Sequence, residues 1–453
     1  MNLRSSSIIA SLVVLVIQLE LIQGYCTPKN KYCWPSENVW QRRLGSCLDG
    51  NLHKFNPTVL LRCQNINSSM VLGESANGAC MQIPECSKRF CLADQPSNLP
   101  SYSVEAKTTR DVVRAFKFAN RFNIAVTVKT TGHSFSGSSF GRDTLMIWMR
   151  NFQKFGDIST TFEDSCHVKY PASIKIGGGQ IWSEIYSKIA GTEYNIMGAL
   201  APVVSAAGGW LQGSGLSPLS RQHGLGVDNV ISFKVVQPNG CVVTADACRN
   251  KDLFWALRGG GGGTFGVVVS TQYRLLPKKP ITFLALGLSP IQIPFEQYLR
   301  IVHRFMDFWT VKSAILDNRW GGLWNGTSLA LFFEGDRKEA EATLINDLFA
   351  WRSQFNEAFH QNIFTLLQDF PGVSEASIAL AQFFQLDNTA IASSTKDIGN
   401  RLIPKKWIKE NPQAAAGILK RLFKETLQTG KFVSSYILGG AVSNVLIRRR
   451  QSK

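Results

Sequence analysis

The sequence predicts an α+β protein with two folded parts, and three observations support this prediction. The chain has 453 residues, which is too long for one ordinary core and favours two or three domains. Between about residues 96 and 278, β-branched runs alternate with glycine-rich turns and amphipathic helices, a pattern typical of mixed helix–sheet folds. After Pro277, longer amphipathic helices lie between β-rich pieces, so a second part is predicted over residues 279–453.

Residues 1–24 are predicted to be a signal peptide, which makes the protein secreted. Arg4 precedes an apolar run from Ile8 to Ile17, and the small residue Gly24 follows as a cleavage site. The run is too short for an ordinary membrane span, although a signal anchor that stays uncut is the alternative. In the secretory pathway, the sequons at Asn67 and Asn325 would be usable glycosylation sites.

Residues 25–95 form a cysteine-rich segment. Seven of the ten cysteines fall there, namely Cys26, Cys33, Cys47, Cys63, Cys80, Cys86 and Cys91. In an exported protein this density predicts a disulfide-bonded segment, whose pairing cannot be read from spacing. Zinc binding is the alternative, but Cys80, Cys86 and Cys91 lack the C-x-x-C pairs that zinc sites favour, so no metal is predicted.

Helical and strand patterns start near residue 101. Thr108 to Asp111 resembles a helix-capping signal, and Val112, Phe116 and Ala119 follow at helical spacing. The run NIAVTV at residues 123–128 then predicts a buried strand. Further along, ASIKIGGGQ predicts a strand with a glycine turn, and IWSEIYSKIA predicts an amphipathic helix.

Two β-rich runs flank Pro238-Asn239-Gly240 and predict a hairpin. Cys241 and Cys248 flank its second strand, so we expect a local disulfide, with free buried thiols as the alternative. Asn250 is predicted to cap a short helix over KDLFWAL, and a strand follows the glycine run at 259–263. In the second part, SLALFFEG predicts a strand among three helices, at about residues 294–310, 335–355 and 411–428.

Three glycine-rich loops adjoin predicted strands, at residues 130–137, 208–215 and 259–266. Glycine costs backbone entropy there, so it must provide positive φ or room for a ligand against bare N–H groups. One such loop would be weak evidence, but three in one domain predict a cofactor cradle. His133 lies within the first loop, in VKTTGHSFSGSS; the alternative is a surface histidine in a polar turn.

Other nucleotide and catalytic motifs are excluded by their spacing. The sequence has no G-x-x-x-x-G-K-[ST] loop, and GGGGGTFG precedes a strand rather than the helix of a Rossmann site. GHSFSG is one residue too long for a nucleophile elbow. The net charge of +17 is dispersed, apart from Arg448 to Arg450, so it indicates no nucleic-acid partner.

Three stretches closely resemble a known family: KTTGHSFSGSS, GGWLQGSGLSPLSRQHGLGVDNV and DLFWALRGGGGGTFGVVVSTQYRLLP. They are similar, in order and spacing, to the flavin domain of the vanillyl-alcohol-oxidase-type flavoproteins, and the nearest branch is the berberine-bridge-enzyme-like oxidases. The resemblance implies an FAD-binding PCMH-type domain over residues 96–278. It also implies a substrate domain, an antiparallel sheet with helices, over residues 279–453.

The resemblance also implies how FAD is held. His133 would bond covalently to the flavin 8α-methyl group, and a neutral imidazole is chemically competent for this bond. Many relatives carry a second link through a cysteine before a proline, but Ala201 precedes Pro202 here, so a single attachment is expected. The other implied cofactor-binding residues are Val128, Thr130, Thr131, Gly132, Ser134, Gly137, Ser138, Gly209, Gly213, Gly215, Leu216 and Val230.

The implied function is that of a secreted FAD-dependent oxidoreductase. It would transfer a hydride from an alcohol, sugar or similar small organic substrate to covalently bound flavin, with O2 as the acceptor. Tyr436 is a candidate catalytic base, and a structural tyrosine on a core strand is the alternative. A flavin-binding protein with weak or no catalysis is the competing function.

The C-terminal stretch departs from the family pattern. A looser resemblance runs through YILGGAVSNV, after which relatives continue with further strands and an aromatic Y-x-x-L-like segment, whereas this chain reads LIRRRQSK. We therefore expect an incomplete substrate domain with weak turnover. A truncated gene product and a natural variant would both have this sequence.

Overall fold

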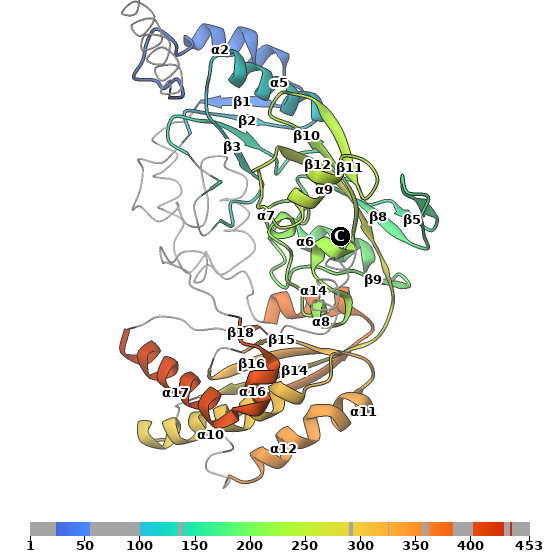
Figure 1. Cartoon of the computed structure of the whole chain (residues 1–453), viewed down its shortest axis with the longest axis vertical. Helices are drawn as coiled ribbons and strands as arrows, with labels where there is room; N and C mark the ends of the chain where they lie inside the picture. The colour runs from blue at the N-terminus through green and yellow to red at the C-terminus, as the bar shows by residue number, and fades with distance from the viewer. Residues whose placement is uncertain are drawn as a thin grey trace, which may run out of the picture.

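The computed structural model describes residues 24–54, 100–134, 138–139, 141–289, 293–324, 326–355, 360, 362–383, 402–429 and 435–436. In Figure 1 the N-terminal strands lie at one end of the long axis, and the sheet that contains β14 to β16 lies at the other. Among the described helices, none is both long and apolar enough to cross a membrane. The predicted signal peptide and Cys63, Cys80, Cys86 and Cys91 lie outside the described residues.

The first sheet is four-stranded, in the order β1-β2-β4-β3, and is parallel except for β1. Its strands are β1 (Asn51–Lys54), β2 (Tyr102–Glu105), β3 (Val126–Lys129) and β4 (Leu145–Trp148). β3 is shorter than the predicted strand over 123–128 and only partly buried, because it lies at the edge of the sheet.

Two helices and a short 3-10 turn cover this sheet. They are α2 (Glu37–Arg43), the 3-10 turn Gly45–Cys47 and α5 (Thr109–Arg121). The predicted cap is confirmed, because the Asp111 carboxylate accepts the Thr108 N–H at 3.0 Å in a capping box. Trp40 of α2 is fully buried and stacks on Tyr102, with ring centroids 4.1 Å apart.

The second sheet has five antiparallel strands in the order β11-β10-β12-β8-β5. They are β5 (Ile158–Ser159), β8 (Ser173–Gly177), β10 (Val230–Val236), β11 (Val242–Asp246) and β12 (Val267–Arg274). The predicted hairpin is confirmed, with Val236 opposite Val242. Small pairs accompany this sheet: β6 (Phe162–Glu163) with β7 (Lys169–Tyr170), and β9 (Tyr194–Asn195) with β13 (Leu276–Pro277).

The predicted Cys241–Cys248 disulfide is wrong. Cys248 is bonded to Cys166, while Cys241 is free and exposed. The whole of β11 separates Cys241 from Cys248, and an extended strand of about five residues at ~3.3 Å each is too long for a disulfide to span. In the cysteine-rich segment, Cys26 is bonded to Cys33, which agrees with the predicted disulfide bonding there, and Cys47 is free.

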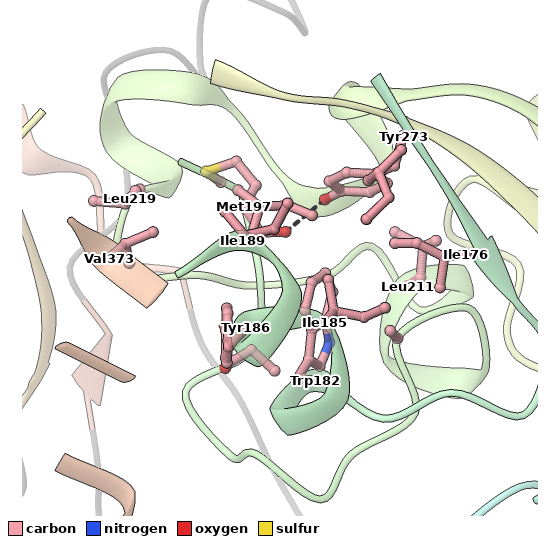
Figure 2. Close-up of a cluster of buried hydrophobic side chains, with 14 of the residues drawn as sticks. Ile176, Trp182, Ile185, Tyr186, Ile189, Met197, Leu211, Leu219, Tyr273 and Val373 are labelled. Atoms are coloured by element: carbon pink, nitrogen blue, oxygen red, sulfur yellow. Dashed lines mark hydrogen bonds between the residues drawn. The ribbon is translucent and has the colours of Figure 1, made fainter. Parts of the chain in front are cut away.

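The helix α6 (Trp182–Ile189) forms the centre of the core between the sheets. All five apolar positions predicted for this helix are buried, and Figure 2 shows Trp182, Ile185, Tyr186 and Ile189 among the core side chains. The hydroxyl of Tyr273, on β12, donates to the carbonyl of Met197 at 2.8 Å, so this buried polar group is satisfied.

Short helices connect the strands of this region. They are α7 (Gly209–Gln212), α8 (Ser220–His223), the 3-10 turn Gly226–Asn229 and α9 (Lys251–Leu257). The predicted helix α9 is confirmed, but Asn250 does not cap it with its side chain. The Asn250 amide instead donates to the carbonyl of Thr244 at 2.7 Å.

The C-terminal sheet is antiparallel, in the order β17-β14-β16-β15-β18. Its strands are β14 (Ile281–Leu288), β15 (Trp320–Trp324), β16 (Ser328–Glu334), β17 (Ile363–Phe370) and β18 (Ser435–Tyr436). The strand predicted from SLALFFEG is β16. Phe283, Ala285 and Phe332 on one face of this sheet belong to the same core as α6, so the two parts of the chain share one hydrophobic core.

Helices pack on the opposite face of the C-terminal sheet, as Figure 1 shows for α10 and α17. The helices of this region are α10 (Phe295–Ile315), α11 (Arg337–Ala340), α12 (Asn346–Arg352), α14 (Val373–Phe383), α16 (Lys405–Glu410) and α17 (Pro412–Thr429). The three predicted helices are present, and the one expected at 335–355 contains the π-helical segment Glu341–Ile345. α14 instead packs beside α6 in the shared core.

Candidate cofactor site

A cavity of about 400 Å³ lies where the three glycine-rich loops meet. Its wall includes Thr130 to Ser134 of the first loop, Gly208 to Gly209 of the second, and Gly262, Gly263 and Gly266 of the third. The volume is in the range of small-molecule and cofactor sites. The described wall contains no Asp, Glu, Lys or Arg, so an anionic ligand would have to be held by N–H and O–H donors.

The predicted site residues within the described part of the chain divide into two groups, those that line the cavity and those that do not. Eight line the cavity: Val128, Thr130, Thr131, Gly132, His133, Ser134, Ser138 and Gly209. Gly137 lies outside the described residues. The other four support the wall from behind: Gly213 ends α7, Gly215 and Leu216 contact Trp210, and Val230 is buried in the core at the start of β10.

His133 follows the end of β3 by four residues. The chain reverses at Gly132, whose φ of +80° strongly favours glycine. Thr131 is buried, and its hydroxyl lies 2.9 Å from Nδ1 of His133. This contact fixes the orientation of the imidazole at the cavity wall.

Glycine lets the loops approach one another closely around the cavity. A Cβ on Gly262 would lie 2.8 Å from the Cα of Gly209, so neither a side chain nor a methyl group fits between the second and third loops. A Cβ on Gly209 itself would meet nothing within 4 Å, which shows that this bare backbone faces open space. The arrangement fits a nucleotide, whose phosphates bind well against exposed backbone N–H groups.

The structure adds wall residues that sequence reasoning missed. The principal ones are Met149, Gly178, Val204, Ser205, Trp210 and Gln212. Ser205 and Gln212 are buried, and each carries an oxygen without a hydrogen-bond partner among the described residues. Gly178 could have been found from the GGG turn after β8, whereas Met149 and Val204 give no local signal.

A buried ion-pair network supports the Gly178 turn. Arg150 donates to the carbonyl of Gly179 at 3.2 Å and to the carboxylate of Glu184 at 3.1 Å. Burial raises the pKa of Glu184, but the bond from Lys154, the charge of Arg150 and the N–H of Ile181 together lower it below its ordinary value. The carboxylate is therefore ionised at neutral pH and holds Arg150 against the cavity wall.

The backbone of Tyr436 lies in β18, at the edge of the C-terminal sheet. The backbone of β18 pairs with β15, which places Tyr436 opposite Leu323. Leu323 is opposite Ala330, and Ala330 is opposite Ala285, so these four positions form one row across the sheet. Because Ala285 belongs to the shared core, this row lies on the face of the sheet toward the first part of the chain.

Comparisons with known proteins agree with this geometry. A family model described as an FAD binding domain matches residues 100–246. A VAO-type flavoprotein oxidase from Thermothelomyces thermophilus is 34% identical over 301 residues, which cover 60% of this chain and 50% of the relative. The chain spans about half the length of the first curated relatives it matches, several of which are named FAD-linked oxidoreductases.

Solved structures show the same fold. A VAO-type flavoprotein from Myceliophthora thermophila matches with a TM-score of 0.68 and 25% identity, over 91% of this chain and 77% of that one. A berberine bridge enzyme variant in complex with (S)-reticuline matches with a TM-score of 0.59 and 19% identity, over 89% and 75% of the two chains. The fold is the mixed α+β, PCMH-type FAD-binding fold, and the chain contains an FAD binding domain and resembles VAO-type flavoproteins in structure.

Proposed function

We propose that this protein is a secreted FAD-dependent oxidoreductase that oxidises an alcohol, sugar or similar small organic molecule, with FAD attached through His133 alone. The observation that carries the proposal is the meeting of three glycine loops and His133 around one cavity, in a chain whose residues 100–246 match an FAD binding domain. Bound FAD would supply the hydride-accepting chemistry, with O2 as the final acceptor. A relative named a flavoprotein oxidase supports the choice of O2.

The residues of this chain would hold the cofactor from three sides. The N–H groups of the glycine loops would hold the phosphates, because the described wall offers no cationic side chain. Thr131 would orient the imidazole of His133, which would carry the covalent link. Ala201 before Pro202 supports a single link, because alanine has no nucleophilic group for a second one.

The substrate would lie between the cofactor and the C-terminal sheet, as the family resemblance implies. The row Ala285, Ala330 and Leu323 supports this placement, because it lies on the face toward the first part of the chain. The backbone of Tyr436 is paired with Leu323 in this row, and its side chain would act as the base that accepts a proton from the substrate.

Secretion is supported by the disulfides Cys26–Cys33 and Cys166–Cys248. Disulfides form and persist in oxidising compartments, whereas the cytosol keeps thiols reduced. Mass analysis of the protein from both the cells and the culture medium of the native host, with and without reduction, would test it. Fully reduced cysteines together with an intact N-terminal run would contradict secretion.

Acid precipitation tests the covalent link. The wild-type pellet should be yellow, the His133→Ala pellet should be colourless, and the flavin of that variant should appear in the supernatant. His167→Ala is the matched control, because His167 is a surface residue outside the cavity wall, so its pellet should stay yellow. Wild-type colour that washes into the supernatant would show that FAD is not covalently bound.

Anaerobic bleaching tests the oxidoreductase activity. A panel of alcohols and sugars should include a substrate that bleaches the flavin, and admitting O2 should restore the colour with release of hydrogen peroxide. If the flavin is bound but no member of the panel bleaches it, the protein binds flavin without having the proposed activity.

A further inference from the structure

The loop that follows the cavity wall connects it to the C-terminal sheet. We name residues 215–226 the bracing loop. It starts three residues after α7, carries α8, and is closed at its base where the N–H of Gly226 donates to the carbonyl of Gly215 at 2.6 Å. The N–H of Val227 closes the next pair with the carbonyl of Ser214 at 3.1 Å, so the two ends of the loop are held together.

The two ends of the bracing loop pack against Trp210, a residue that lines the cavity. A Cβ on Gly226 would lie 2.8 Å from Cη2 of the Trp210 indole, and one on Gly215 would lie 3.0 Å from the same atom. The indole is therefore packed directly on bare backbone at both ends of the loop. Its Nε1 also donates to the carbonyl of Leu216 at 3.2 Å, and its ring contacts Trp182 edge-on.

The other end of the bracing loop is anchored by Arg221, which is only 2% exposed. Its Nη1 donates to the carbonyls of Asp317 at 3.0 Å and Trp320 at 2.9 Å. Its Nη2 donates to the carbonyl of Leu316 and to Oδ1 of Asn318, both at 2.9 Å. All four acceptors lie on residues 316–320, which connect α10 to β15.

This anchor is rigid for two reasons. A buried guanidinium is expensive unless its donors are satisfied, and four acceptors bind its two terminal nitrogens, while Nε has no hydrogen-bond partner among the described residues. Close backbone packing reinforces it, because a methyl group at Gly321 would overlap the carbonyl oxygen of Pro218 in the bracing loop.

We propose that Arg221 is a positioning residue for the cofactor. By anchoring the bracing loop to residues 316–320, it fixes Gly215 and Gly226, and these hold the Trp210 indole in the cavity wall. The inference rests on the proposed function, in which this cavity binds FAD. It predicts that a residue outside the cavity wall controls FAD affinity, and that it does so through Trp210.

The test measures FAD affinity in a His133→Ala background, where FAD can exchange. Flavin fluorescence titrations should show that Arg221→Met weakens FAD binding by tenfold or more. Arg319→Met is the matched control, because Arg319 also contacts Asp317 but otherwise pairs with Glu339 on its own side of the interface. The control should bind FAD like the His133→Ala parent.

A double-mutant cycle tests the route through Trp210. In a Trp210→Ala background, Arg221→Met should cause little further loss of FAD affinity, because the element it positions is gone. Asn318→Ala, which removes one acceptor and keeps the three carbonyls, should show a smaller loss in the same direction and does not depend on the folding of Arg221→Met.

The outcomes separate the two proposals. A His133→Ala parent that binds no FAD would contradict the proposed cofactor site, and the inference would fall with it. Suppose that the His133→Ala parent binds FAD. If Arg221→Met then binds FAD as tightly as that parent, or no more weakly than Arg319→Met does, only the inference about Arg221 is overturned. If Arg221→Met weakens FAD binding as much in the Trp210→Ala background as in the parent, the proposed route through Trp210 is overturned.

Discussion

Glu184 is a single side chain outside the cavity that supports its wall. It accepts bonds from Arg150 and Lys154 and from the N–H of Ile181 at the start of α6. Its folded pKa is lowered below the ordinary value of 4.5, so it contributes stability that is fully present above that value and is lost as the pH falls through the folded pKa.

We therefore expect Glu184→Gln to lower the free energy of unfolding by about 1–3 kcal/mol at pH 7, the usual worth of hydrogen bonds to charged groups. The loss should shrink as the pH falls through the lowered folded pKa, because the wild-type carboxylate then also becomes protonated. Urea unfolding over a series of pH values from 7 downward measures this. Glu163→Gln, which removes a surface carboxylate whose ion pair among the described residues is with the exposed His167, is the control and should change little. A loss that stays the same even where the wild-type carboxylate is protonated would rule out the charge as the cause.

At the scale of residues, the sequence could predict only the part of the site that is continuous in the chain. Thr131, Gly132 and His133 share one loop, and their composition indicates a cofactor. Met149, directly after β4, and Val204, in the segment before α7, reach the same cavity through tertiary packing alone. Apolar side chains of this kind look like ordinary core residues in the sequence.

At the scale of elements, the disulfide Cys166–Cys248 connects the β6–β7 hairpin to the end of β11. The two cysteines are 82 residues apart, so the bond closes a long loop in the unfolded chain. Asp246 lies beside it and accepts the N–H of Cys248 and the hydroxyl of Ser165. The hairpin is therefore held by both covalent and hydrogen-bonding contacts.

Replacing Cys248 by serine should lower the free energy of unfolding by about 2–4 kcal/mol, because closing a long loop constrains the unfolded chain. Cys241→Ser is the matched control, since Cys241 is free and exposed, and it should leave stability within about 0.5 kcal/mol. Thermal and urea unfolding of the oxidised proteins measure both. Equally large losses for Cys241→Ser and Cys248→Ser would instead indicate the Cys241–Cys248 pairing expected from the sequence.

Elements that depend on local contacts could be predicted, and those that depend on distant ones could not. The α5 cap and the β10–β11 hairpin need only neighbouring residues, so capping and turn residues reveal them. The pairing of β12 with β8 joins segments about 95 residues apart. No turn signal specifies such a pairing, and for the same reason the sequence could not indicate the partner of Cys166.

At the scale of the whole molecule, the two parts of the chain are joined by more than the anchor at Arg221. Phe283, Ala285 and Phe332 from the C-terminal sheet pack in the same core as α6. Separating the two parts would expose these large apolar surfaces, which disfavours a state with only one part folded.

We accordingly expect a single cooperative thermal transition. Scanning calorimetry should give one peak, with matching midpoints from far-ultraviolet and near-ultraviolet circular dichroism. Phe332→Ala should lower the midpoint without splitting the transition, because it weakens a core that both parts share. Two separated peaks in the wild type would show that the parts unfold independently.

The acceptors of Arg221 have a consequence for the protein in acid and in high salt. They are carbonyl and amide oxygens, which carry no titratable charge. Ion pairs elsewhere between the two parts, such as Lys278–Glu375, weaken when the carboxylate is protonated or when salt screens the charges. The hydrogen bonds at Arg221 are thus weakened by neither, and together with the shared apolar core they would continue to join the two parts as acidity or ionic strength rises.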